Sequence, residues 1–97
     1  MPRIPNSSPQ TLAVLSALDR SEDWRHGLSL AQETGLKAGT LYPLLLRLHE
    51  AGYLDAEWQP PERPGRPPRH AYRLNAAGRA LAEERLAQRR SGPQPAR

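Results

Sequence analysis

Leucine recurs in the first half of the chain at the three- and four-residue intervals that place side chains on one helix face. The earliest run comprises Leu12, Leu15 and Leu18. It follows Ser8-Pro9, and a serine N-cap with proline at the first helical position is a frequent helix start. The pattern predicts a helix from Ser8 to about Arg20, preceded by a flexible tail over 1–7.

Two further helices are expected. A short one fits 27–34, with Leu28 and Ala31 on its inner side and Gly35 in the left-handed conformation that ends many helices. A longer one fits 38–51. Its inner face carries Leu41, Leu45 and Leu48, and its outer face carries Thr40, Pro43, Arg47 and Glu50.

Beyond Gly52 the pattern changes from helical to alternating, and 53–58 and 69–74 each have the pattern of a half-buried strand. The segment between them holds five prolines at 60–68, which predicts a stiff loop. Asn75 is a good N-cap for a last helix through 90, followed by a tail over 91–97. We therefore expect a mainly α fold with a small β-hairpin: a winged helix-turn-helix domain over 8–74 and a C-terminal dimerisation helix over 75–90.

Positive charge is concentrated in the second half of the chain. Residues 1–57 hold five basic and seven acidic side chains, whereas 58–97 hold nine basic and three acidic ones. Nearly all the basic residues are arginine, whose planar guanidinium matches phosphate oxygens and guanine edges. This asymmetry indicates a nucleic-acid partner.

Several other classes of protein are excluded. The chain has no cysteine, so disulfides, thiolate catalysis and the common zinc-finger spacings are absent. No segment reaches the roughly 18 apolar residues of a membrane span, and the start lacks a secretory signal, so we expect a cytoplasmic protein. The scattered histidines at 26, 49 and 70 form no metal spacing, and no catalytic constellation is present. We expect no metal, no cofactor and no enzyme activity.

The helices at 27–34 and 38–51 form a candidate helix-turn-helix, whose outer face would enter a major groove about 12 Å wide. The loop at 60–68 would lie along the phosphate backbone or in the minor groove. The candidate DNA-binding residues are Lys37, Thr40, Tyr42, Pro43, Arg47, Arg63, Arg66, Arg69 and His70. The simpler alternatives are a three-helix core with a solvated outer face and a linker rich in proline and arginine.

These segments resemble the PadR family of transcriptional regulators. The similarity covers roughly 11–85, although Ala71 stands where the family tends to carry an aromatic residue and Asn75 where threonine is usual. It rests on Gly39-Thr40-Leu41-Tyr42-Pro43, Arg47-Leu48, Gly52-Tyr53-Leu54, Trp58, Gly65-Arg66-Pro67 and Ala77-Gly78. The resemblance implies a dimer that binds inverted-repeat operators in double-stranded DNA, represses nearby genes and is released by a small molecule.

The last helix is the element expected to form the dimer contact. Its apolar stripe is narrow, so a dimer contact is expected to be close-packed and to recruit the first helix. The candidate dimerisation residues are Leu12, Leu15, Leu74, Ala77 and Leu81. The simpler alternative is that this helix covers its own domain.

Two other functions stay open. One is a winged-helix protein-interaction module without DNA binding, supported by the net negative first half and by Glu33 and Glu50. The other is a sensor whose output is a dimer rearrangement, with Trp24 and Trp58 as walls for a planar aromatic effector. The operator, the regulated genes and the effector lie beyond what one sequence specifies.

Overall fold

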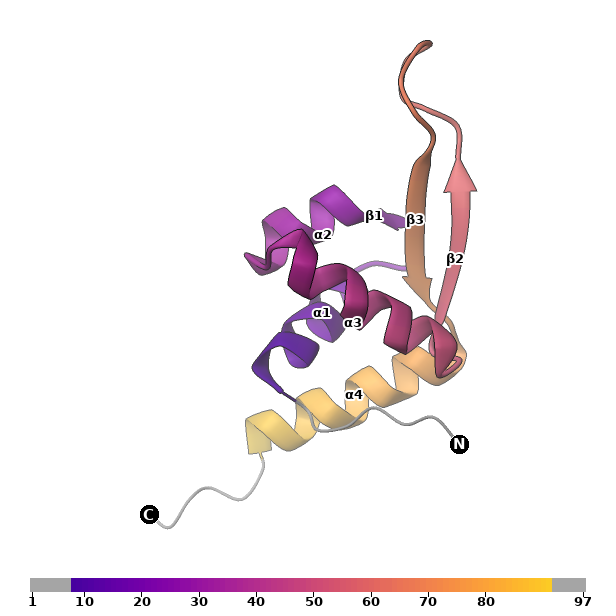
Figure 1. Cartoon of the computed structure of the whole chain (residues 1–97). Coiled ribbons are helices and arrows are strands. Elements are labelled where there is room, and N and C mark those ends of the chain that lie inside the picture. Colours follow the sequence, from indigo (N-terminus) through magenta and orange to yellow (C-terminus); the bar gives the residue numbers. More distant parts are fainter. Residues whose placement is uncertain (1–7, 92–97) are drawn as a thin grey trace.

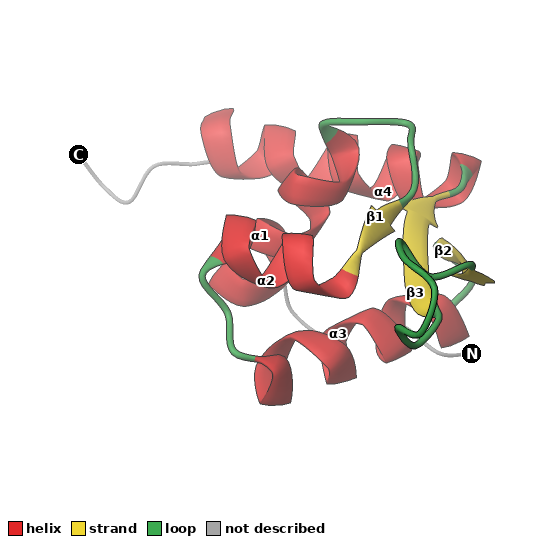
Figure 2. Cartoon of the chain, turned by 90° about the horizontal axis from the view of Figure 1, so that it is seen from above, coloured by secondary structure: helices red, strands yellow, loops and turns green. Residues whose placement is uncertain are grey.

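The computed structural model describes residues 8–91. The elements in this part of the chain are α1 (Pro9–Asp19), β1 (Arg25–His26), α2 (Gly27–Thr34), α3 (Ala38–Glu50), β2 (Leu54–Gln59), β3 (Arg69–Leu74) and α4 (Ala76–Ser91). The hairpin of β2 and β3 ends in a loop that projects beyond the helices (Figure 1). From above, α1 and α2 lie between α3 and α4 (Figure 2). The expected winged helix-turn-helix fold with one appended helix is confirmed.

Local signals determine where the helices begin and end. The Ser8 hydroxyl accepts a hydrogen bond from the amide of Thr11 at 3.1 Å, as an N-cap does. In the same way the side-chain oxygen of Asn75 accepts from the amide of Gly78 at 2.8 Å. Gly35 ends α2 with a φ of +75°, a conformation that costs glycine little. Each of these positions was predicted from the sequence.

The sheet contains one strand more than the predicted hairpin. β1 pairs antiparallel with β3, so that Arg25 lies opposite Tyr72 and His26 opposite Ala71, and the strand order is β1-β3-β2. A strand of two residues has no periodicity of its own. It forms because a distant strand offers an unpaired edge, which a local pattern does not reveal.

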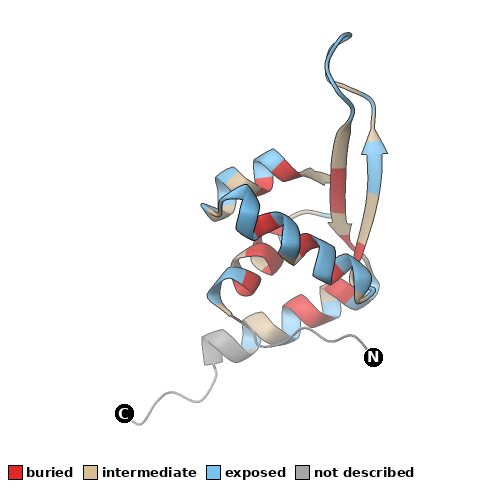
Figure 3. Ribbon diagram, viewed as in Figure 1, coloured by how far each residue is buried: buried red, intermediate tan, exposed pale blue. Residues whose placement is uncertain are grey.

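The core lies between α1, α3 and the inner face of the sheet. Leu41, Leu45 and Leu48 of α3 are buried as predicted, and they pack with leucines of α1 and the strands. Figure 3 shows the buried positions on the inner sides of the helices and the exposed ones on the outer side of α3. The inner face of α3 is thus fully used, and its outer face is free.

The predicted inner face of α2 was partly wrong. Leu28 is 70% exposed, whereas Leu30 is fully buried and Ala31 packs against the core. In a helix of only eight residues, a rotation of about 100° moves one leucine out and another in. The position of α2 between its neighbours decides which leucine is buried.

α4 is held against the rest of the chain at its first turn. The Arg79 guanidinium pairs with the Asp19 carboxylate at 3.2 Å, and Gly78 approaches the backbone of Tyr53 so closely that an added Cβ would lie 2.1 Å from its carbonyl oxygen. The helix ends at Ser91, one residue beyond the predicted end. The tail predicted at 1–7 lies outside the described residues, as does the tail predicted at 91–97 apart from Ser91.

Candidate nucleic-acid interface

The outer face of α3 presents the predicted reading residues. Lys37 is the N-cap residue of the helix and is exposed, as are Thr40, Pro43 and Arg47. Proline lacks an amide hydrogen, so Pro43 leaves the carbonyl of Gly39 without its usual helical donor. Because Gly39 is itself exposed, water or a ligand is free to bond that carbonyl. The face is accessible along its length.

Tyr42 lies at the flank of α3 and reaches α2. Its ring is 42% exposed, and a Cβ built on Gly27 would lie 2.1 Å from the Tyr42 hydroxyl oxygen. The tyrosine therefore packs over the start of α2, and a side chain larger than glycine at this point would displace the tyrosine ring. The sequence motif places Tyr42 near the interface, but the structure shows that it also connects the two helices of the helix-turn-helix.

The wing carries its arginines on a turn. Gly65 adopts a φ of +87°, and the amide of Arg66 donates to the carbonyl of Arg63 at 3.2 Å. Both arginines are exposed. Arg69, at the start of β3, lies 3.9 Å from Glu62, and its Nε is buried without a hydrogen-bond partner among the described residues. An unpaired buried donor costs free energy unless a ligand oxygen satisfies it.

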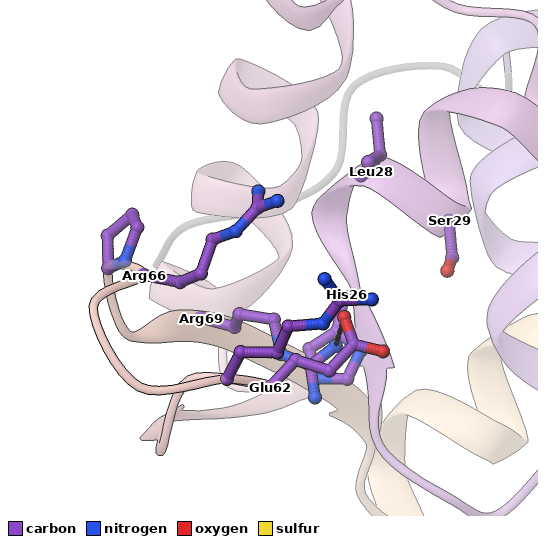
Figure 4. A pocket seen from close by; sticks show the side chains of 8 residues that line it. His26, Leu28, Ser29, Glu62, Arg66 and Arg69 are labelled. Atoms are coloured by element: carbon purple, nitrogen blue, oxygen red, sulfur yellow. Dashed lines mark ion pairs between the residues drawn. The ribbon is translucent and has the colours of Figure 1, made fainter.

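The wing arginines border a hollow of about 480 Å³ shared with the start of α2. Its lining comprises His26, Leu28, Ser29, Glu62, Arg63, Arg66, Pro67 and Arg69. Figure 4 shows Arg66 of the wing and Leu28 of α2 on two sides of it. A helix N-terminus carries partial positive charge from its free amides. The wing arginines and the first turn of α2 therefore combine into one positive region.

His70 belongs to an aromatic stack at the base of the wing. Its ring stacks on Trp58 with centroids 4.4 Å apart, and the Tyr72 hydroxyl lies 3.0 Å from its Nδ1. Burial, followed by the charge of Tyr42, raises the pKa of Tyr72. Trp58 itself is 69% exposed. This side chain belongs to the accessible surface, although it was absent from the predicted DNA-binding residues.

A second hollow, of about 470 Å³, separates α3 from the hairpin. Tyr42 and Leu46 line it on the α3 side, and Trp58 and His70 line it on the strand side. Leu46 is 56% exposed and was also missed, because the helical pattern alone assigns it neither to the core nor to the charged face. Together these residues give an apolar surface between the two predicted DNA-contacting elements.

Glu33 and Glu50, the two acidic residues that could repel phosphate, differ in their surroundings. Glu33 forms ion pairs with both Arg20 and Arg25. The hydrogen bond from Arg25, with the positive charges of Arg25 and Arg20, outweighs desolvation by burial and holds the Glu33 pKa below its ordinary value. Glu33 is therefore charge-compensated within the chain, so it no longer supports repulsion of phosphate. Glu50 remains exposed at the end of α3.

The two tryptophans do not form one ligand site. The guanidinium carbon of Arg73 lies over the Trp24 ring, 4.4 Å from the ring centroid. Trp58 shares its sheet face with His70, and the register places Arg73 on the opposite face. The idea that both rings enclose one planar ligand was wrong, because strand alternation separates them.

The predicted dimerisation residues lie mostly inside the chain. Leu15, Leu74 and Leu81 belong to the buried core, Leu12 is almost fully buried, and only Ala77 is exposed. Leu12 borders a shallow groove of about 270 Å³ between α1 and α4, together with Pro9, Ala13, Ser16 and Leu86. Packing against α1 and the strands uses most of the apolar stripe of α4.

None of the described helices is both long and apolar enough to cross a membrane. Within residues 8–91, no three His, Cys, Asp or Glu side chains gather as metal ligands would.

Comparisons with known proteins agree with this geometry. The model of the PadR-like transcriptional regulator family matches residues 14–84. A PadR-like transcription factor from Bacteroides fragilis superposes with a TM-score of 0.68 at 27% identity, covering 82% of this chain and 79% of that one.

Two structures with lower sequence identity share the fold. A PadR family transcription regulator from Clostridium difficile gives a TM-score of 0.71 at 21% identity, covering 84% of this chain and 86% of that one. NadR in complex with 4-hydroxyphenylacetate gives 0.65 at 22% identity, covering 84% of this chain and 55% of that one. A comparison with curated protein sequences finds no match. Because the family model spans most of its length, the chain belongs to the PadR-like family of DNA-binding transcriptional regulators.

Proposed function

We propose that the protein is a dimeric repressor that binds an inverted-repeat operator through α3 and the wing. The observation that carries this proposal is the placement of the wing arginines beside the start of α2, on a surface continuous with the open face of α3. The orphan Nε of Arg69 supports it, because a phosphate oxygen would supply the missing partner. Lys37 and Arg47 add two further cations on α3.

The salt dependence of DNA binding tests the electrostatic part. Five cations per protomer correspond to roughly six to ten phosphate contacts in a dimer, for which affinity falls about 10³- to 10⁵-fold between roughly 50 and 200 mM salt. Fluorescence anisotropy on duplexes selected from a random library measures this. A protein that selects no duplex from the library, or binds with no salt dependence, would contradict the proposal.

The dimer is proposed to form along the groove between α1 and α4. Its lining is mostly apolar and shallow, which suits close packing against a second copy of the same surface. Ala13 borders the groove and is not part of the buried core, so Ala13→Glu introduces a charge there without opening a cavity. We expect it to convert the dimer to a monomer in sedimentation velocity. Gln32→Glu on the exposed side of α2 is the matched control and should leave the dimer intact.

Release by a small aromatic effector is the remaining part of the proposal. One structure of the same fold binds 4-hydroxyphenylacetate, and the hollow beside Trp58 offers this chain a ring-lined site of suitable volume. Titration of 4-hydroxyphenylacetate into Trp24→Phe, which leaves Trp58 as the sole tryptophan, should quench its fluorescence. Quenching in Trp58→Phe instead would place the effector near Trp24, and no quenching in either would reject this compound.

A further inference from the structure

The outer face of α3 is uncharged over the first nine of the thirteen residues of the helix. No residue from 38 to 46 carries a charge, and the first cation on the helix is Arg47. Thr40, Pro43 and Leu46 follow one another at three-residue intervals, and all three are exposed. At this spacing they form a gently slanted stripe along the outer face. The stripe ends in a leucine that is 56% exposed.

Such an apolar stripe can discriminate between base pairs in two ways. It leaves polar base edges without hydrogen-bond partners, and it makes favourable contacts with apolar groups. The edge of a G·C pair presents polar groups to the major groove, and an apolar side chain that covers them leaves them without partners. The edge of an A·T pair presents the C5-methyl group of thymine, which an apolar side chain buries favourably. Both kinds of pair carry polar groups on this edge, so the methyl group is what distinguishes thymine, and the exposed apolar side chains of α3 are complementary to that group.

We propose that Leu46, together with Pro43, is a thymine-methyl contact that gives the operator a thymine requirement. The proposal rests on the DNA-binding function and assigns its sequence preference. Arg47, one residue further, is placed to read a neighbouring guanine, because an arginine bonds both acceptors of its major-groove edge. Each half-site is then expected to carry thymine beside guanine where Leu46 and Arg47 of α3 lie.

DNA is the occupant that the surroundings favour. The apolar stripe lies between Lys37 and Arg47 on α3, and the hollow beside Leu46 is continuous, through Tyr42, Trp58 and His70, with the space leading to the wing. A surface flanked by cations on both sides complements a polyanion rather than an apolar protein partner. A protein partner would be the alternative use of the same leucine.

Replacement of thymine by uracil removes only the methyl group, and this makes the test specific. In a duplex selected by the protein, each thymine of a half-site is changed in turn to deoxyuridine. We expect one or two positions to lose about fourfold in affinity, the value of one buried methyl group. Leu46→Ala should bind thymine and uracil equally at the position that Leu46 contacts. Where two positions respond, the one that Leu46 contacts should lose its preference and the one that Pro43 contacts should keep it. Because Leu46 is exposed, this variant keeps its core, and circular dichroism verifies its fold.

Gln32→Ala is the control, since Gln32 is exposed on α2 and lines none of the hollows beside the wing. It should keep the preference of the parent protein for thymine. Equal binding of thymine and uracil at every position by the parent protein would overturn the methyl contact while leaving DNA binding intact. A preference that survives Leu46→Ala at every responding position would also overturn the role of Leu46. Absence of binding to any duplex would instead refute the proposed function.

Discussion

α3 and the wing present opposite chemistry on their exposed surfaces. The outer face of α3 is neutral as far as Leu46, and its only cation is Arg47, which is followed by Glu50. The wing places three arginines on and beside a loop stiffened by prolines, next to the start of α2. Phosphates are the same at every sequence, whereas base edges differ. The difference indicates that the wing supplies affinity and α3 supplies sequence preference.

Removal of the wing charges should have the largest effect. Replacement of Arg63, Arg66 and Arg69 by alanine removes up to six phosphate contacts from a dimer, so the slope of log K against log salt should fall by about five. Affinity should drop for every duplex sequence alike. Anisotropy titrations at several salt concentrations measure both quantities. A loss of affinity confined to one duplex sequence would contradict the proposal that the wing supplies affinity and α3 supplies sequence preference.

The change of Arg47 to alanine should act on sequence instead. A bidentate contact to guanine contributes about 1–3 kcal/mol of discrimination, so preference at one base pair should relax by roughly fivefold to 150-fold. Competition between the selected duplex and its single-base variants measures this. Arg20→Ala, a change of an arginine away from the outer face of α3, serves as the control. A uniform loss over all variants would show that Arg47 contacts phosphate.

A smaller effect is expected at the junction between α2 and α3. In Gly27→Ala the new methyl group meets the Tyr42 hydroxyl, so the tyrosine must rotate at a cost of about 0.5–1.5 kcal/mol. The moved ring should weaken DNA binding severalfold. Gly39→Ala, which meets no atom within 4 Å, is the control and should stabilise α3. Thermal unfolding and anisotropy separate the two consequences, and unchanged binding in Gly27→Ala would remove Tyr42 from the interface.

The smallest effect concerns Glu33, which neutralises two arginines away from the wing. Its pKa in the folded chain is lowered from the ordinary 4.5, so its contribution to stability is complete above that pH. The contribution is lost as the pH falls through the folded value. Because the pairs are exposed to solvent screening, Glu33→Gln should cost at most about 1 kcal/mol at neutral pH. Urea unfolding at pH 7 and pH 3 measures it, and an equal cost at both would exclude an ionic origin.

Much of the fold was accessible from the sequence because its signals are local. The caps at Ser8 and Asn75 and the left-handed Gly35 are decided by a few neighbouring atoms. The inner leucines of α3 repeat over three turns, which is long enough to define a face. The eight residues of α2 are too few to define a face. The sequence therefore predicted that Leu28 is buried, whereas Leu30 is the buried leucine.

The sequence alone determined the order of elements, the uncharged and charged segments of the interface, and the family resemblance, since each depends on residues close together in the chain. Tertiary structure decided the rest. It paired β1 with β3, buried the leucines once assigned to a dimer, and placed Trp24 and Trp58 on opposite faces of the sheet. It also left Leu46 exposed beside Arg47. These outcomes depend on contacts between distant segments, where packing of the whole chain determines which surface remains free for DNA.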